Sequence, residues 1–365
     1  MNPTEQGRAA TAHVNAIGTA LPPHEVHAKF LDYAPRALPL PRERALFARM
    51  AARSGIERRR SVLAPAAEGE RLDAGGFFRA EAETPTSARM ALFAAEAPAL
   101  AEAALADLGA RLGPRWAAGL THLITVTCTG FTAPGIDAHL IARCGLPADV
   151  ERTQVGFMGC NAALNGLKLA RHVVRSDPAA RVLVVNVELC TLHFQSPGSL
   201  DKALTFLLFA DGASAMLVTA EPTGLALGRF HQEIVPGTPR EITWDVGDAG
   251  FDMRLSGDVP RHIGAALPAH VAALLGQAPL SEVGLWAVHP GGRSVLDAAE
   301  AALGLAGEAL ATSRAVLREH GNMSSVTVPF ILARMLEESA NGRQGVALGF
   351  GPGLGIESLA FSEAA

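Results

Sequence analysis

A cysteine in the segment VGFMGCNAALNGLKLAR, residues 155–171, stands where a covalent nucleophile could act. Cys160 follows Gly159, which permits a close backbone approach, and precedes residues with the apolar spacing of a buried helix. Free N–H groups and the positive end of such a helix favour the thiolate, which is the reactive form of the side chain. The alternative is that Cys160 only packs in the core, as most free cysteines do.

Two further residues could work with such a thiolate in acyl transfer. His289 follows the strand-like run VGLWAV and precedes Pro-Gly-Gly, a turn that exposes its ring, and Asn322 opens a helical segment. An imidazole and a carboxamide can each donate a hydrogen bond to a developing oxyanion, and acyl transfer needs no base that activates water. Taken singly, His289 is more simply a structural turn residue and Asn322 a helix cap.

The elements that must position these residues form two matching sets. Cys128 follows an apolar strand and precedes Cys160 by 32 residues, and His289 follows a strand and precedes Asn322 by 33. In each set the first residue lies at a strand end and the second at a helix start. This spacing predicts a duplicated βαβ-type unit in which Cys160, His289 and Asn322 meet at one central site.

The hydrophobic pattern predicts the remaining elements of an α/β protein. Strands are expected at 13–18, 123–126, shortly before 160, at 181–188, within 204–218, at 283–288 and at 356–361, and helices at 41–60, 87–112, 136–144, from 162, from 294 and at 321–338. Residues 61–85 lack periodicity and are expected to form a surface loop.

The predicted helix at 41–60 carries seven arginines in a chain that is otherwise mildly acidic. A solvated helix face and a patch that binds phosphates both explain this run.

Composition excludes several classes of protein. The net charge of −5 argues against a nucleic-acid partner, and no segment is apolar enough for membrane insertion. The four cysteines form no CxxC pair, which indicates reduced thiols and a cytoplasmic protein. No HxxxH or HExxH pair, GxSxG elbow or GxGxxG loop is present, so we expect no metal, serine-hydrolase or dinucleotide site; the glycines at 349–355 are interpreted as backbone passing close to a bound acyl group.

Four motifs in this order, GCNAA around Cys160, HPGG at His289, GNMSS at Asn322 and GFGPG from Gly349, resemble those of the type III polyketide synthases, the chalcone synthase superfamily. The similarity extends from about residue 13 to residue 361. It implies the thiolase fold, a five-layered αβαβα duplication with halves at residues 1–220 and 221–365. It also implies a homodimer with an independent site in each subunit.

The resemblance implies a role for each matching position. Cys160 would take a starter acyl group from coenzyme A, while His289 and Asn322 would stabilise the thioester carbonyl as malonyl-CoA loses carbon dioxide. Phe209 would be the aromatic gatekeeper between the coenzyme A tunnel and the cavity. The other cavity positions are Met253, Cys128, Cys190, His193, Trp244 and Phe350, and the positions that would contact coenzyme A are Arg49, Arg53, Ser294 and Ser324. No cofactor is expected, since the acyl-CoA starter and malonyl-CoA are substrates.

Several positions depart from the plant enzymes. Met253 replaces a second gatekeeping phenylalanine, Trp244 a glycine, and Ala133 a methionine that crosses the dimer interface; Cys128, Cys190 and His193 replace threonines. The p-coumaroyl-CoA specificity of the plant enzymes therefore does not carry over. The replacements resemble the bacterial branch, whose members make alkylpyrones, alkylresorcinols or related small aromatics.

Two other functions remain open at this point. A ketoacyl-ACP synthase III also uses Cys, His and Asn but condenses once, and its motifs usually read HQAN and GNTSA where this chain has HPGG and GNMSS. A catalytically silent scaffold subunit of a synthase complex is the other, and the intact set of Cys160, His289 and Asn322 argues against it. The preferred hypothesis is an iterative synthase that extends an acyl-CoA starter by decarboxylative Claisen condensation and then cyclises the product.

Overall fold

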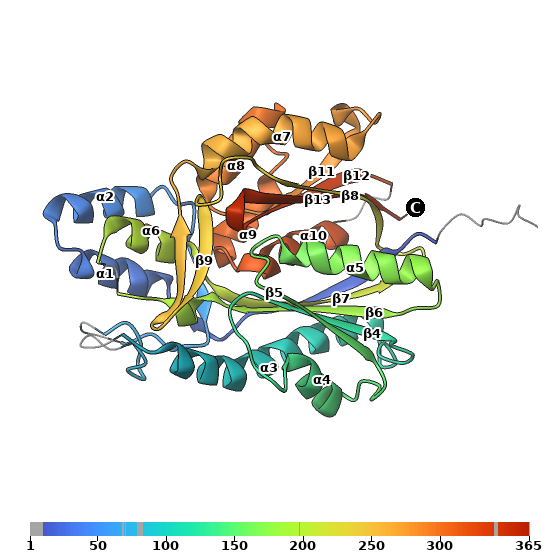
Figure 1. Ribbon diagram of the computed structural model, residues 1–365, viewed down its shortest axis with the longest axis horizontal. Helices are drawn as coiled ribbons and strands as arrows, with labels where there is room; N and C mark the ends of the chain where they lie inside the picture. Colours follow the sequence, from blue (N-terminus) through green and yellow to red (C-terminus); the bar gives the residue numbers. More distant parts are fainter. Residues whose placement is uncertain are drawn as a thin grey trace, which may run out of the picture.

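The structure is a computed structural model that describes residues 10–67, 69, 71–78, 83–196, 198–338 and 342–364. Within these residues, nine strands are hydrogen-bonded in the order β11-β12-β13-β8-β1-β7-β6-β4-β5. The two parts of this order join where β1 pairs with β8 through His13 and Val14. Figure 1 shows them as two separate layers, with β8, β11, β12 and β13 in the upper one.

The first half of the described chain contains β1 (His13–Ala20), β2 (His24–Glu25), α1 (His27–Ala37), α2 (Pro41–Ala51), β3 (Arg60–Ser61), α3 (Thr86–Leu112), β4 (His122–Thr127), α4 (Ile136–Cys144), β5 (Glu151–Gly156), α5 (Ala162–Ser176), β6 (Val182–Leu189), the 3₁₀ helix η1 (Cys190–His193), α6 (Leu200–Leu208) and β7 (Asp211–Thr219). The second half contains β8 (Leu225–Ile234), β9 (Ile242–Gly247), β10 (Gly250–Leu255), α7 (Val259–Leu275), η2 (Leu280–Glu282), β11 (Val283–Val288), α8 (Arg293–Leu303), α9 (Ala311–His320), η3 (Ser324–Val326), α10 (Thr327–Glu337), β12 (Gln344–Gly351), η4 (Pro352–Leu354) and β13 (Gly355–Glu363).

The two halves repeat one strand topology. In the first, β4 runs parallel to β6, β6 pairs antiparallel with β7, and β7 pairs antiparallel with β1. In the second, β11, β12, β13 and β8 are related in the same way. The predicted duplication is therefore confirmed, and β4 and β11, which precede Cys128 and His289, occupy equivalent places.

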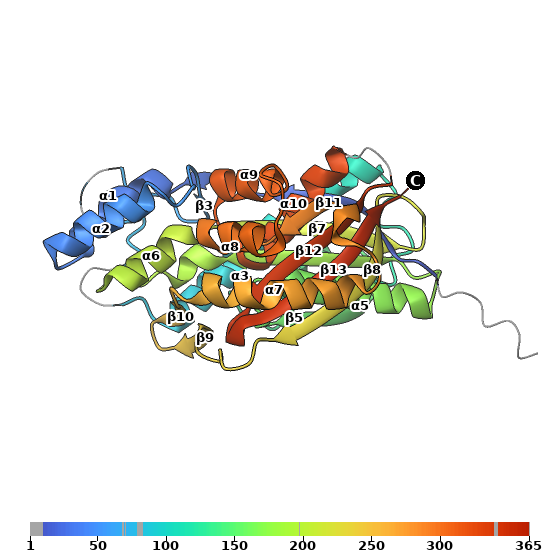
Figure 2. The same ribbon diagram turned by 90° about the horizontal axis from the view of Figure 1, so that it is seen from above.

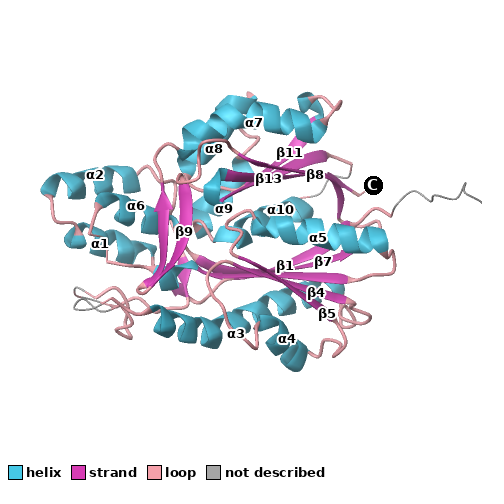
Figure 3. Cartoon of the chain, in the orientation of Figure 1, coloured by secondary structure: helices cyan, strands magenta, loops and turns pink. Residues whose placement is uncertain are grey.

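Helices cover both faces of each sheet, which gives the five layers of the thiolase fold. Figures 1 and 3 show α3 and α4 outside the first sheet, α5 and α10 between the sheets, and α7 and α8 outside the second. Strand β6 shows why a strand that has helices on both faces of its sheet is continuously apolar. Val182 and Val184 pack in the cluster that contains α5, whereas Leu183 and Val185 pack in the cluster that contains α3. All eight β6 residues are buried as a result.

Two predicted helices are shorter than the sequence indicated. Helix α2 ends at Ala51, and Gly55 has a φ of +76°, so the chain continues as extended backbone toward β3 rather than as a helix to Arg60. The segment from Gly321 also starts without a helix. The Asn322 backbone pairs with the α6 end, so α10 begins only at Thr327.

The other predictions agree with the structure within a few residues, including α4 and β11, whose predicted bounds match those observed. Between β3 and α3 the described residues contain no helix, as expected for the loop at 61–85, although residues 68, 70 and 79–82 lie outside the described chain. No helix in the described ranges is both long and apolar enough to cross a membrane.

Candidate active site

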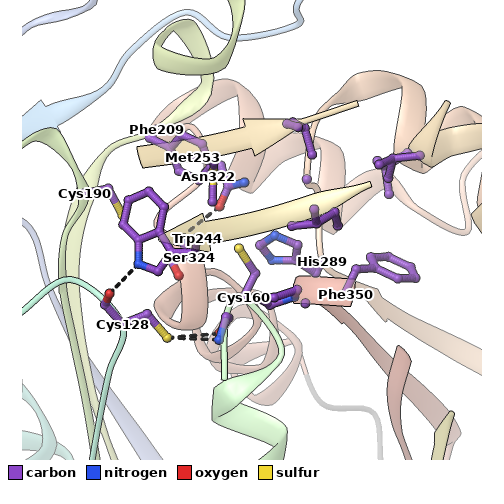
Figure 4. A pocket seen from close by; sticks show the side chains of 18 of the residues that line it. Cys128, Cys160, Cys190, Phe209, Trp244, Met253, His289, Asn322, Ser324 and Phe350 are labelled. Atoms are coloured by element: carbon purple, nitrogen blue, oxygen red, sulfur yellow. Dashed lines mark hydrogen bonds between the residues drawn. The ribbon is translucent and has the colours of Figure 1, made fainter. Parts of the chain in front are cut away.

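Cys160, His289 and Asn322 line one cavity. Cys160 lies in the turn before α5, His289 directly after β11, and Asn322 between α9 and η3. Figure 4 shows the three side chains gathered around one space. The matched intervals in the sequence predicted that Cys160, His289 and Asn322 would meet, and the structure brings them together from both halves of the duplication.

Glycines allow β12 to pack against the turn that carries Cys160. Gly159 has a φ of +89°, and a Cβ atom there would lie 2.3 Å from Pro352 Cδ. A Cβ atom on Gly351 would lie 2.7 Å from Asn161 Oδ1. The glycine-rich run after residue 348 thus packs closely beneath Cys160, and Gly351 also lines the cavity, so the predicted proximity of this backbone to a bound acyl group stays a prediction.

Burial raises the pKa of the Cys160 thiol to about 12, although contacts with the Ser324 and Asn322 side chains lower it. This direction is opposite to the thiolate expected from the sequence, because loss of solvation outweighs the field of the helix terminus. Burial also lowers the pKa of His289 to about 3. A neutral thiol therefore faces the same cavity as a neutral imidazole at pH 7.

His289 and Asn322 bring polar groups to the wall of this cavity. His289 is 1% exposed, and neither of its ring nitrogens has a hydrogen-bond partner within the described residues. Asn322 Oδ1 accepts a hydrogen bond from the Ser324 N–H at 2.8 Å. Because the carbonyl oxygen is occupied, the amide NH₂ of Asn322 is the group left to donate. The site can thus offer two neutral donors to an oxyanion.

A buried carboxylate that the sequence analysis did not single out links the segments of the site. Glu188 is 0% exposed and accepts hydrogen bonds from the Cys128 N–H at 3.0 Å, Thr129 Oγ1 at 2.7 Å and Ser325 Oγ at 2.6 Å. Burial raises its pKa. Its hydrogen bonds join the end of β4 to the segment after Asn322. The sequence marked Glu188 only as the end of a strand.

The β9–β10 hairpin forms one wall of the cavity. Trp244 and Met253 are cross-strand partners in it, and Trp244 Nε1 donates a hydrogen bond to the Cys128 carbonyl at 2.7 Å. Figure 4 shows both side chains beside the cavity. The other predicted wall residues that line it are Cys128, Cys190, Phe209 and Phe350. This lining is almost wholly apolar.

His193 does not line the cavity, contrary to the prediction. Its side chain is 0% exposed, Nε2 donates to the Thr129 carbonyl at 2.7 Å, and Nδ1 accepts from the Phe251 N–H at 3.0 Å. Its ring stacks on Phe251 with centroids 4.1 Å apart. His193 therefore supports the hairpin from behind the wall, and burial lowers its pKa to about 3.

A second, more open hollow adjoins the cavity. Arg53, Arg293 and Ser294 line it, and it shares Val259 and Gly291 with the inner cavity. Two of the four predicted coenzyme A contacts thus lie where a phosphate-bearing group could enter, and Arg293 is an additional cation that the sequence did not identify.

The other two predicted coenzyme A contacts lie elsewhere. Arg49 is exposed on α2 and does not line the open hollow. Ser324 lines the inner cavity beside Cys160. Ser324 is 5% exposed, so it is too deep for the entrance.

The arginine run divides into residues with different environments. Arg59 is 3% exposed, and its Nη1 donates to the carbonyls of Phe206 at 2.9 Å and Phe209 at 2.6 Å. Its Nε donates to His27 Nδ1 at 2.9 Å. Arg59 therefore holds the backbone of Phe209, the predicted gatekeeper. Neither a solvated helix face nor a phosphate-binding patch accounts for all seven arginines of residues 41–60.

Comparison with known proteins agrees with this architecture. The model of the N-terminal domain of chalcone and stilbene synthases matches residues 2–222, and the model of the C-terminal domain matches residues 226–364. A Mycobacterium tuberculosis protein described as the alpha-pyrone synthesis polyketide synthase-like Pks18 is 32% identical over 370 residues, covering 96% of this chain and 91% of the relative. Type III polyketide synthase 10 of rice is 34% identical over 264 residues, covering 66% of this chain and 65% of the relative.

Solved structures have the same fold along nearly the whole chain. The polyketide synthase PKS-I of the brown alga Ectocarpus siliculosus gives a TM-score of 0.88 at 29% identity, covering 98% of this chain and 100% of its own. The type III polyketide synthase domain of Steely1 from Dictyostelium gives a TM-score of 0.89 at 26% identity, covering 97% and 100%. The chain therefore belongs to the chalcone and stilbene synthase family and is a type III polyketide synthase, an acyltransferase.

Proposed function

We propose that Cys160 is the acyl carrier of this synthase and that His289 and Asn322 stabilise the oxyanions formed around it. The observation that carries the proposal is the joint placement in one apolar cavity of a thiol, an amide donor and an imidazole that has no hydrogen-bond partner in the described part of the chain. In the loading step, the Cys160 proton moves to His289, the sulfur attacks the thioester carbonyl of an acyl-CoA starter, and coenzyme A leaves as its thiol after taking that proton.

In the extension step, malonyl-CoA enters the same cavity and its carboxylate leaves as carbon dioxide. The electron pair of the broken carbon–carbon bond passes to the thioester as an enolate, whose oxygen accepts hydrogen bonds from His289 and Asn322. The enolate carbon attacks the acyl carbonyl, the carbon–sulfur bond breaks, and Cys160 leaves as its thiolate while the extended chain remains on coenzyme A. Repeated loading and extension would lengthen the chain before cyclisation.

The neutral state of His289 suits this step. A neutral imidazole donates one hydrogen bond and leaves the malonyl carboxylate without a cation to hold it. The apolar walls formed by Phe209 and Met253 solvate that carboxylate poorly, which favours its loss as an uncharged gas.

The open hollow is the proposed binding site for coenzyme A phosphates. Arg53 and Arg293 line it together with Asp201 and Asp297, and Arg293 Nε lies 3.5 Å from Asp297 Oδ2. Arginine side chains of this kind can bind phosphate oxygens, and Ser294 supplies a hydroxyl close to the start of α8. Phe209 stands on the inner side, since it lines the inner cavity and not the open hollow.

The proposed product is an alkylpyrone, an alkylresorcinol or a related small aromatic. The description of the mycobacterial relative as alpha-pyrone synthesis polyketide synthase-like supports the pyrone within this group. Trp244, which lines the cavity at a position where the resemblance gives plant enzymes a glycine, supports a starter different from the coumaroyl group of those enzymes.

We further propose a cytoplasmic homodimer. Four free cysteines suit a reducing compartment. Phe131 and Met158 are 46% and 45% exposed, close in sequence to Ala133 and Cys160, and a second subunit would cover them. Light scattering on a sizing column is expected to give twice the chain mass of 37.9 kDa.

The decisive experiment on the reaction is incubation of the purified enzyme with acyl-CoAs of graded length and malonyl-CoA, followed by mass spectrometry. Products extended by two or more malonyl-derived units support the proposal. A single extension that occurs only on acyl carrier protein would instead identify a ketoacyl-ACP synthase III-like enzyme. If no acyl-CoA is extended, and alkylation of Cys160 by iodoacetamide changes no activity, the protein would be a scaffold subunit.

A further inference from the structure

A cluster of two histidines and a glutamate lies on the outer face of the second sheet. His231 and Glu233 are alternate residues of β8, so their side chains lie on one face, and His270 reaches them from α7. One ligand atom from each residue lies within 4.8 Å of the other two. Figure 2 shows α7 running across this sheet. None of the three residues lines the cavity that contains Cys160.

His270 is unusual for its position. Leu267, Val271 and Leu274 on the same helix are buried against the sheet, and His270 lies on that apolar face with its side chain 0% exposed. Burying a polar ring there is costly unless both ring nitrogens have partners. Glu233, in contrast, is 38% exposed at its side chain, so water and ions can reach the cluster from its side.

The hydrogen bonds around His270 define which nitrogen is free. Ser358 Oγ donates its single proton to the His231 carbonyl oxygen at 3.0 Å. Ser358 must therefore accept from His270 Nε2, which lies 2.9 Å away, so Nε2 carries a proton. The lone pair of the neutral ring then resides on Nδ1. That atom faces Glu233 Oε2 at 3.3 Å.

A lone pair and a carboxylate oxygen at this separation need a positive charge between them. We propose that the charge is a divalent transition-metal ion of the Zn²⁺ class, bound by His270 Nδ1, a ring nitrogen of His231 and a carboxylate oxygen of Glu233, with water as the fourth ligand. Two imidazoles and one carboxylate form a donor set that Zn²⁺ prefers. The Nε2–H···Ser358 bond is the outer contact that metal-binding histidines usually make.

The site would fasten α7 to β8. The first turns of α7 contribute Val259 and Ile263 to the cavity wall, and His270 lies about 10 Å further along the helix from Ile263. A metal at His270 would therefore hold in place the helix that forms part of the substrate cavity. The inference concerns binding alone and does not depend on the proposed reaction.

The test uses full-length protein stripped of metal and titrated with Co²⁺, whose visible absorption reports tetrahedral nitrogen and oxygen ligation, and with Zn²⁺ as competitor. We expect one equivalent to bind. Affinity should fall at least tenfold in His231→Ala and in Glu233→Gln, and about tenfold in Ser358→Ala, which loses only the outer contact. His262→Ala, on the same helix but outside the cluster, should bind as the unaltered protein does.

Thermal unfolding gives a second readout. Zn²⁺ at a hundredfold excess over the dissociation constant of the unaltered protein should raise the midpoint of that protein and of His262→Ala by a few degrees, and should raise the midpoint of Glu233→Gln by about half as much or less. Absence of Co²⁺ absorption in the unaltered protein would overturn the proposal, because a proton would then be the charge between His270 and Glu233. Equal binding by His231→Ala and Glu233→Gln, or a thiolate charge-transfer band, would overturn it by placing the metal elsewhere.

Discussion

Replacing Gly159 with alanine should displace Cys160 by about an ångström and nearly silence the enzyme. The new Cβ atom would lie 2.3 Å from Pro352 Cδ and 3.2 Å from Gly351 Cα, whereas ordinary contacts begin near 3.4 Å. The turn must therefore move by about 1.1 Å, since the proline ring is attached to the backbone of β12 and η4 and cannot rotate away. An error of about 1 Å in positioned reacting groups costs roughly 10²-fold in rate.

Gly145→Ala is the matched control. Gly145 also has a positive φ, +65°, but a Cβ atom there would have no neighbour within 4 Å. It should therefore lose about 1 kcal/mol of folding free energy through backbone strain and keep its turnover. The assay is the initial rate of product formation from saturating acyl-CoA and malonyl-CoA, together with chemical unfolding of both variants. The reasoning is refuted if Gly159→Ala keeps more than about a third of the rate, or if Gly145→Ala loses as much.

Three other changes test separate parts of the structure. Because the pKa of His193 is about 3 in the folded protein and near 6.5 when unfolded, stability should be lost as pH falls from 6.5 toward 3; His193→Gln should reduce the slope of unfolding free energy against pH by about 1.4 kcal/mol per unit. Arg53→Ala should raise the KM for acyl-CoA roughly tenfold with little change in kcat, whereas Arg49→Ala, outside the open hollow, should behave as the unaltered enzyme in the same steady-state assay. Trp244→Ala removes an indole from the cavity wall, so mass spectrometry should show a shift toward longer starters or more extensions; an unchanged product profile would mean that Trp244 does not limit the cavity.

The regular elements could be predicted where one physical signal dominates. Strand β11 is a short apolar run between turn residues, and α4 ends at a glycine in the left-handed conformation, so both were predicted with their observed bounds. Helix α2 was predicted too long because its arginines continue past Ala51 while Gly55 breaks the helix. The start of α10 depends on pairing between Asn322 and the α6 end, which no local pattern reveals.

The candidate active site could also be predicted only in part from the sequence. Cys160, His289 and Asn322 could be brought together from the sequence because the duplication gives them matching places. The ionisation of Cys160 could not, because its desolvation depends on walls contributed by distant segments. Glu188 was missed for a similar reason, since its hydrogen-bond donors approach it only in the folded chain.

His193 shows that a role assigned to a residue by family resemblance need not fit the folded chain. The resemblance to the family implied a cavity position for His193, but hydrogen bonds to Thr129 and Phe251 hold its ring behind the hairpin. Ser324 was predicted to contact coenzyme A, whereas its side chain lies beside Cys160 in the inner cavity.

Intact-protein mass spectrometry after brief exposure to an acyl-CoA starter, without malonyl-CoA, tests the central claim most directly. The unaltered enzyme should gain the mass of one acyl group, located by peptide mapping at Cys160, and Cys160→Ala should gain none although Cys128 and Cys190 line the same cavity. Acylation of another residue, or continued polyketide formation by Cys160→Ala, would contradict the account.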